Sequence, residues 1–214
     1  MKVRIVKKGK GALEFLLEGA PVSFANALRR IMVTEVPVLA IDWVEIIENS
    51  SAIFDEMIAQ RLGLIPLAFD PDKFEFQDAC GCGGKGCASC TVTFALERDV
   101  PGLALSGDLK SSNRTVKAVD PGFPIAELLP GQKLRFEATA RLGRGKEHAK
   151  FQAANAVFEN HPEADEKGVV NTNPQAFLFR VESISGLDPE DIVSKAGEIL
   201  RDKAKAFKKE AADL

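Results

Sequence analysis

The sequence predicts an α+β protein in which one domain is interrupted by a second, β-rich domain. Three observations lead to this prediction. Both ends of the chain combine β-type runs with a helix that carries an apolar stripe. The middle, residues 67–158, instead contains short β-type runs broken by turn residues. We therefore expect a discontinuous domain at residues 1–45 and 166–214, and an inserted domain at residues 46–165.

The N-terminal region predicts two strands followed by a helix. Alternating apolar and charged residues near the start and an apolar run at residues 12–18 flank a glycine-containing turn. The helix is expected to begin at Ser23, a favourable N-cap residue, and to end before Pro37. Its apolar face contains Phe24, Ala27, Leu28, Ile31 and Met32.

The middle of the chain predicts mostly strands. A strand at residues 38–48 precedes a short helix at about residues 53–62, which Gly63 and a following proline should end. Residues 91–96 and 134–140 are short β-type runs separated by turn residues and predict strands.

The C-terminal region predicts a polar linker, a strand at residues 176–182 and a long helix. Asp188 should cap this helix, with Pro189 at its first position. Its apolar stripe contains Ile192, Val193, Ala196, Ile199, Leu200 and Phe207. The lysine-rich last turns are typical of a solvated helix end rather than a nucleic-acid patch, because acidic residues are interleaved. Each apolar stripe either covers its own sheet or meets a partner chain, and periodicity does not separate these alternatives.

Composition excludes several classes of protein. The formal net charge of -3 lacks the basic excess of a free-standing nucleic-acid binder. A membrane span is not expected because no run of about eighteen apolar residues occurs. The N-terminal segment alternates apolar and basic residues, unlike a signal peptide. We therefore expect a cytoplasmic protein whose thiols stay reduced.

The strongest chemical signal is a cluster of four cysteines with the spacing C-x-C-x4-C-x2-C. The cysteines are Cys80, Cys82, Cys87 and Cys90. Thiolates bind Zn²⁺ tetrahedrally or hold an iron–sulfur cluster. The four glycines between them permit the sharp backbone reversals that a common centre requires. Lys85 and the loop amides would offset the thiolate charge.

Two disulfides or four buried free thiols are the alternatives to metal binding. A reducing compartment argues against disulfides, and a polar, glycine-rich loop argues against burial. We favour structural zinc over an iron–sulfur cluster because four sulfur ligands with no open position are the usual structural zinc site. The same closed ligand set makes catalysis at the metal improbable.

No motif in the sequence indicates an autonomous active site. The two histidines are His148, in a glycine-containing loop at residues 143–150, and His161, in the polar linker. The loop could cradle phosphate through its amides, but it lacks the spacing of a nucleotide-binding P-loop. Asp70 and Asp72 flank a proline and are typical of a turn. We predict no catalytic residues in this chain.

Several motifs in order resemble one protein family. They are residues 24–32 (FANALRRIM), 35–37 (EVP), 40–42 (AID), 55–67 (DEMIAQRLGLIPL), 108–111 (DLKS), 143–151 (GRGKEHAKF) and 181–183 (VES). The chain resembles the assembly subunits of multi-subunit DNA-directed RNA polymerases. This family includes archaeal assembly subunits, the third-largest subunit of eukaryotic RNA polymerase II and the bacterial alpha amino-terminal domain. The archaeal members are the most similar, and the resemblance extends from about residue 3 to residue 205.

The resemblance implies a scaffold function in transcription. A discontinuous dimerisation domain would pair, through the two striped helices, with a smaller subunit L. The pair would nucleate assembly of the two large catalytic subunits, helped by small subunits N and P, and would meet DNA only through the complex. Residues 26–30 and 143–151 would contact the enzyme body.

The resemblance also bears on the cysteine loop, which matches the zinc loop of the eukaryotic relative. Some archaeal members hold iron–sulfur clusters in an additional ferredoxin-like domain. We expect this chain to lack that domain, because no cysteine follows Cys90 and residues 158–173 are too few to hold it. An independent metal or redox protein built on the cysteine loop is the alternative function.

Overall fold

The chain forms two compact units in the computed structural model, which describes residues 1–161 and 175–212. The first unit contains Met1–Val36 and Gln152–Leu214, and the second contains Pro37–Phe151. The first unit is thus interrupted in sequence by the second. This arrangement confirms the predicted α+β class and the predicted insertion of a β-rich region.

The boundaries between the units differ from the expected ones. The first unit ends after Val36 instead of residue 45, because β3 (Val38–Asn49) pairs along its length with β10 (Leu134–Gly143) of the second unit. The chain returns to the first unit at Gln152, because β11 (Ala154–Asn160) pairs with a strand of that unit. The expected boundary at residue 165, and most of the linker expected to be too short for a further domain, lie outside the described residues.

An antiparallel four-stranded sheet forms the base of the first unit. Its strands, in spatial order, are β1 (Lys2–Gly9), β2 (Ala12–Glu18), β12 (Ala176–Ser183) and β11 (Ala154–Asn160). Phe15 of β2 lies opposite Phe179 of β12, and their buried rings stack with centroids 4.8 Å apart. Because aromatic side chains remove large apolar areas from water, this pair anchors the core of the unit.

The first helix, α1 (Val22–Thr34), covers part of this sheet but begins earlier than predicted. Pro21 occupies the N-cap position, and its carbonyl accepts hydrogen bonds from the amides of Phe24 and Ala25. The predicted N-cap, Ser23, is therefore inside the helix. Ala25, Leu28, Ile31 and Met32 are buried, whereas Phe24 and Ala27 are half-buried. The buried face is thus rotated slightly from the predicted stripe.

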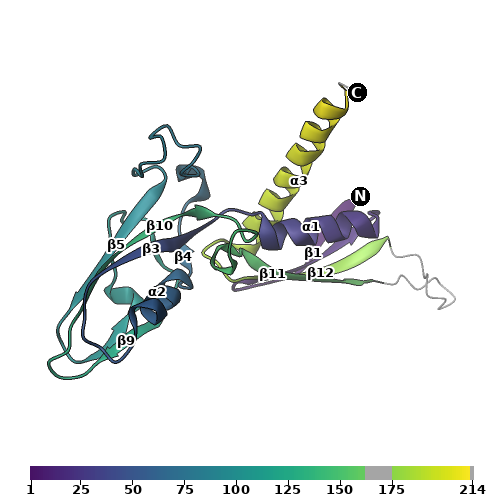
Figure 1. Ribbon diagram of the computed structural model, residues 1–214. Coiled ribbons are helices and arrows are strands. Elements are labelled where there is room, and N and C mark those ends of the chain that lie inside the picture. Colours follow the sequence, from purple (N-terminus) through teal and green to yellow (C-terminus); the bar gives the residue numbers. More distant parts are fainter. Residues whose placement is uncertain (162–174, 213–214) are drawn as a thin grey trace. The chain divides into compact units, whose positions relative to one another are not determined.

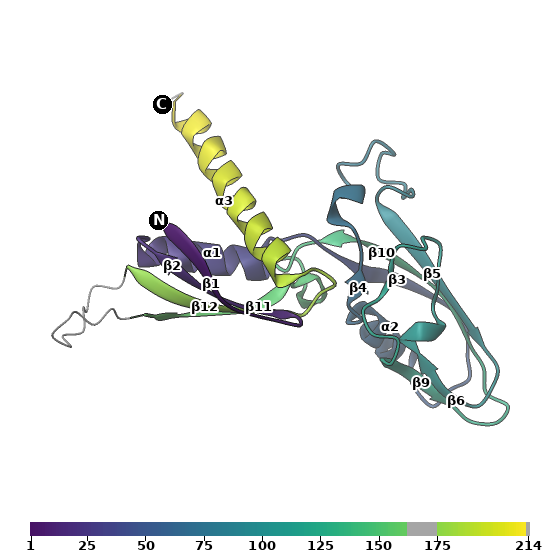
Figure 2. The same ribbon diagram turned by 180° about the vertical axis from the view of Figure 1, so that it is seen from behind.

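The last helix, α3 (Pro189–Ala211), buries side chains against its own unit only in its first half. Ile192 and Ala196 are buried, and Lys203 forms an ion pair with Glu35 at the C-terminal end of α1. One turn later, Phe207 is 75% exposed, on the part of α3 that projects away from the sheet (Figures 1 and 2). The stripe therefore covers its own unit at one end and is unpartnered among the described residues at the other.

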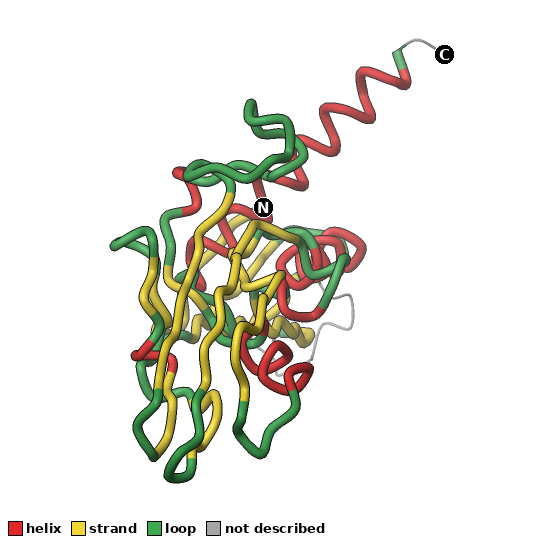
Figure 3. Tube along the Cα trace, turned by 60° about the vertical axis from the view of Figure 1, so that its left-hand side comes forward, coloured by secondary structure: helices red, strands yellow, loops and turns green. Residues whose placement is uncertain are grey.

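The second unit is built on a second antiparallel sheet, whose long strands lie side by side in Figure 3. In spatial order the strands are β3 (Val38–Asn49), β10 (Leu134–Gly143), β5 (Thr91–Arg98) and β7 (Lys110–Ser111). Two small sheets contain β6 (Gly102–Leu105) with β9 (Pro124–Leu128), and β4 (Leu67–Ala68) with β8 (Lys117–Ala118). Helix α2 (Asp55–Gly63) buries Ile58 and Leu62 in this unit.

The helices of the described ranges, 1–161 and 175–212, include none that is long and apolar enough to cross a membrane.

Candidate functional site

The four predicted cysteines come together in one loop of the second unit. The loop lies between the short 3-10 helix η1 (Pro71–Lys73) and strand β5. All four sulfur atoms lie within 4.8 Å of one another. The Sγ atoms of Cys80 and Cys87 are 3.6 Å apart, and those of Cys82 and Cys90 are 3.7 Å apart. Among the described residues, this is the one group of three or more potential ligand side chains that could hold a metal ion.

These distances fit a single tetrahedral ion better than disulfides. A Zn–S bond of about 2.3 Å places the sulfur atoms of a regular tetrahedron about 3.8 Å apart. The Cys87–Cys90 sulfur separation is 3.8 Å, and all four cysteines are free thiols. A disulfide would require sulfurs about 2.05 Å apart. The donor set is therefore suited to a soft metal ion, with no protein ligand position left open.

Glycines and backbone hydrogen bonds shape the loop. Gly83, Gly84 and Gly86 have φ values of 65°, 80° and 85°, a region that side chains rarely adopt. The fourth loop glycine, Gly81, is not among the positive-φ residues. The Cys87 amide donates a hydrogen bond to the Cys90 sulfur at 3.3 Å, as expected of a loop that stabilises thiolate charge. Lys85 is exposed, so its proposed effect on the thiolates would act through solvent.

The thiols of the loop differ in acidity. Burial raises the pKa of Cys82, but hydrogen bonds from the Gly86 amide and from neighbouring thiols outweigh it and lower the pKa to about 7. For Cys80, the hydrogen bond from the Cys82 amide lowers the pKa, but burial and the other thiols raise it to about 12. The Cys82 thiolate therefore forms readily and accepts hydrogen bonds from the neighbouring thiols. A metal ion that binds the four sulfurs would replace the protons that these thiols share.

The loop at residues 143–151 uses several of its own amides for internal hydrogen bonds. Its Arg144 amide donates to the Glu147 carboxylate at 3.1 Å, and its Lys150 amide donates to His148 Nδ1 at 3.1 Å. Both donors are therefore used within the loop. At Gly143, an added Cβ would lie 2.6 Å from the ring of Phe151, so the loop packs closely against the end of β10.

A charge network that the sequence did not reveal holds this loop to β3. The Asp42 carboxylate accepts from Arg141 Nε at 2.6 Å and from Lys150 Nζ at 2.5 Å. Burial raises the pKa of Asp42, but the hydrogen bonds from Lys150 and Arg141 outweigh it and hold the pKa below its usual value. Because 99 residues separate Asp42 from Arg141, no local sequence pattern could have paired them.

Replacing Asp42 by asparagine is expected to destabilise the second unit by about 2–3 kcal/mol at neutral pH, because two charge-assisted hydrogen bonds are lost. A lowered folded-state pKa contributes stability above the unfolded pKa of about 3.9 and loses it as the pH falls through the folded value. The urea unfolding free energies of the two proteins should therefore differ at pH 7 and begin to converge only as the pH falls below about 4. The exposed Asp99→Asn variant is the control, and an equal effect of both substitutions at pH 7 would contradict the assignment.

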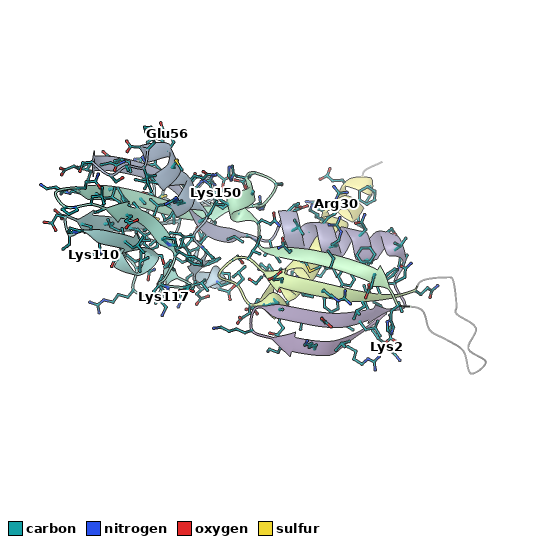
Figure 4. The ribbon with its side chains drawn as sticks, turned by 90° about the horizontal axis from the view of Figure 1, so that it is seen from below. Lys2, Arg30, Glu56, Lys110, Lys117 and Lys150 are labelled. Atoms are coloured by element: carbon teal, nitrogen blue, oxygen red, sulfur yellow. The ribbon has the colours of Figure 1, made fainter. Side chains whose placement is uncertain are left out.

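Exposed apolar side chains mark a second candidate site, on the first unit. Val3 and Ile5 of the edge strand β1 lie opposite Leu17 and Phe15, two buried residues of β2. They therefore extend the buried face of the sheet, yet both are more than half exposed. Figure 4 shows β1, marked by Lys2, at the margin of this sheet. Phe207 is a further exposed apolar side chain of the same unit, and each of the three is a residue that a partner could cover.

Comparison with known proteins gives a family match that covers most of the chain. The model of the RNA polymerase Rpb3/Rpb11 dimerisation domain matches residues 14–204. This range includes the whole of the inserted unit and most of each part of the first unit. The match therefore includes the cysteine loop, whereas Val3, Ile5 and Phe207 of the second candidate site lie outside it.

Similar proteins carry the name DNA-directed RNA polymerase subunit Rpo3. The relative from Pyrococcus horikoshii is 51% identical over 74% of this chain, which spans 59% of that relative's length. The relative from Pyrococcus furiosus is 37% identical over 100% of this chain and 98% of its own length. That alignment has 262 positions for the 214 residues here, so the relative contains residues that this chain lacks. The relative from Archaeoglobus fulgidus is 37% identical over 94% of this chain. By its motifs, its interrupted fold and these matches, the chain belongs to the RNA polymerase Rpb3/Rpb11 dimerisation-domain family.

Proposed function

We propose that this chain is an assembly subunit of a multi-subunit DNA-directed RNA polymerase, and that its first unit forms a heterodimer with a smaller subunit of the same family. The observation that carries the proposal is the apolar stripe of α3. It is buried at Ile192 and Ala196 and continues, exposed, to Phe207. A large aromatic side chain held in water on a projecting helix is typical of a protein interface.

The heterodimer would act as a platform for the large catalytic subunits. We propose the small partner to be subunit L, with subunits N and P joining the same assembly. The chain supplies no catalytic groups in this scheme and approaches DNA only through the complex. The family match and the names of the relatives support this function, and no observation favours an independent metal or redox protein.

In the cysteine loop we propose a structural zinc ion held by Cys80, Cys82, Cys87 and Cys90. Four thiolates at tetrahedral spacing leave no place for a reacting water, so the ion would stabilise the loop. An iron–sulfur cluster is the other group that four thiolates hold. With zinc bound, the loop would hold one conformation on the surface of the second unit.

Affinity purification of the tagged chain from its source organism tests the proposal. Intact mass and elemental analysis would give the subunit stoichiometry and the metal. We expect the two large polymerase subunits and a smaller family member near one to one, together with zinc. Recovery of the chain alone or paired with itself would overturn the polymerase function.

A further inference from the structure

The second unit carries an uncovered sheet face whose side chains are unusual for a solvent-exposed surface. Trp43 is the only tryptophan of the chain and is 72% exposed on β3. Tryptophan is the side chain whose exposure leaves the largest apolar area in water. β3 is an edge strand of its sheet, and residues on the other face of the neighbouring β10, such as Phe136 and Ala138, are buried.

Two glutamates lie next to Trp43 on the same face. Glu45 of β3 pairs directly with Glu137 of β10, and Trp43 pairs with Thr139 in the adjacent position on that face. Directly opposed like charges destabilise an antiparallel pair, so this arrangement costs the isolated chain stability. Among the described residues, neither glutamate has a lysine or arginine nitrogen within 4.0 Å.

The rest of the face is also acidic. Glu48 and Glu97 flank Arg135 in the next row of the sheet, and Lys110 of β7 lies beyond Ala95. Apart from Arg141, this face therefore carries four glutamates and two basic residues. They are Glu45, Glu48, Glu97, Glu137, Arg135 and Lys110. Arg141, further along β10, is already bound by Asp42 and Glu147. The excess of negative charge is complementary to a basic partner.

A hollow beside the tryptophan provides room for a partner side chain. Its volume is about 270 Å³, and it is lined by Asp42, Trp43, Gln77, Thr139 and Arg141. An aromatic ring face binds a lysine or arginine cation within about 6 Å, and the attraction grows as the pair is removed from water. The ring and the paired carboxylates thus offer adjacent sites for one basic segment.

We propose that this face, centred on Trp43 and the Glu45–Glu137 pair, docks a basic segment of another subunit of the same polymerase. A lysine or arginine of that segment lies over the Trp43 ring, and a second one lies between the two carboxylates. The proposal rests on the proposed function, because the partner belongs to the polymerase. It concerns the second unit, whereas the heterodimer with the small subunit uses the first.

Labelling the chain with 5-fluorotryptophan tests this directly, since one tryptophan gives one ¹⁹F resonance. The spectrum is recorded for the chain with its small partner alone and in the complete reconstituted polymerase. We expect the resonance to respond to a D₂O exchange in the first sample and to lose that response in the second. A resonance that remains solvent-sensitive in the complete, active polymerase would overturn the docking surface while leaving the heterodimer intact.

Charge substitutions distinguish docking from a structural role. Glu137→Gln should leave the free chain as stable or more stable, because it removes the like-charge pair, yet weaken incorporation into the polymerase about tenfold. Glu137→Lys should weaken it further. Glu56→Lys, on α2 (Figure 4), is the control for charge reversal and should have no effect. Equal incorporation of Glu137→Lys and the unsubstituted chain, by quantitative mass spectrometry of competing chains, would contradict the proposal.

Discussion

Replacing Phe207 by aspartate is expected to weaken binding of the small partner subunit at least about 30-fold without unfolding the chain. Central aromatic side chains of an interface each contribute about 2 kcal/mol or more, and 1.4 kcal/mol corresponds to a tenfold change in affinity. Phe207 is 75% exposed on the projecting half of α3, so the free chain loses little packing. Isothermal titration calorimetry with the purified small subunit gives the affinity, and circular dichroism reports the fold.

Ser194→Asp provides the matched control for this substitution. Ser194 is exposed on the same helix, and its replacement introduces the same charge. At 3.6 residues per turn it lies on the side of α3 opposite the apolar stripe. We expect its partner affinity to stay within about threefold of the unsubstituted chain. Equal losses for both variants would mean that added charge on the helix, rather than the stripe, controls pairing.

Replacing Cys90 by serine is expected to abolish stoichiometric metal binding. Structural zinc sites in small domains contribute about 10–16 kcal/mol, so removal of one of four thiolates should weaken binding by about 100-fold or more. Cys90 is fully buried, and its sulfur accepts the Cys87 amide hydrogen bond. Elemental analysis gives the metal content, and limited proteolysis reports order in residues 80–90. The loop should become sensitive to protease, while the sheet of the second unit persists on its own core.

The adjacent Ser89→Ala variant controls for loop perturbation. Ser89 is exposed, and the hydrogen bond that Glu75 makes to it uses the Ser89 backbone carbonyl, which the substitution retains. We expect full metal content in this variant. If the Cys90→Ser chain keeps one equivalent of metal and binds it as tightly as the Ser89→Ala chain does, the proposed four-cysteine site is wrong.

The sequence predicted elements well where a local pattern decides the structure. The strand predicted at residues 38–48 is β3, Val38–Asn49. The four cysteines come together as predicted, because they lie within eleven residues and the glycines between them allow the chain to turn. The predicted N-cap of α1 was wrong by two residues because the Pro21 carbonyl, rather than the Ser23 side chain, accepts hydrogen bonds from the first free amides. Local propensity does not distinguish two such neighbouring starts.

Features that depend on distant pairing were not predictable from a single sequence. β11 was expected in the inserted domain, yet it pairs with β12 of the first unit, and only tertiary packing decides which sheet a strand joins. The same holds for the Asp42–Arg141 pair. The exposure of Trp43 was also missed, because alternation in a strand shows two faces but not which of them is covered.

We propose that the exposed end of the α3 stripe is one half of a heterodimer interface. Sedimentation velocity of the full chain at micromolar concentration, alone and with one equivalent of the smaller family member from the same organism, tests for this interface. We expect a single one-to-one complex in the mixture, and self-association or poor solubility for the chain alone. A monodisperse monomer whose sedimentation does not change when the smaller subunit is added would contradict it.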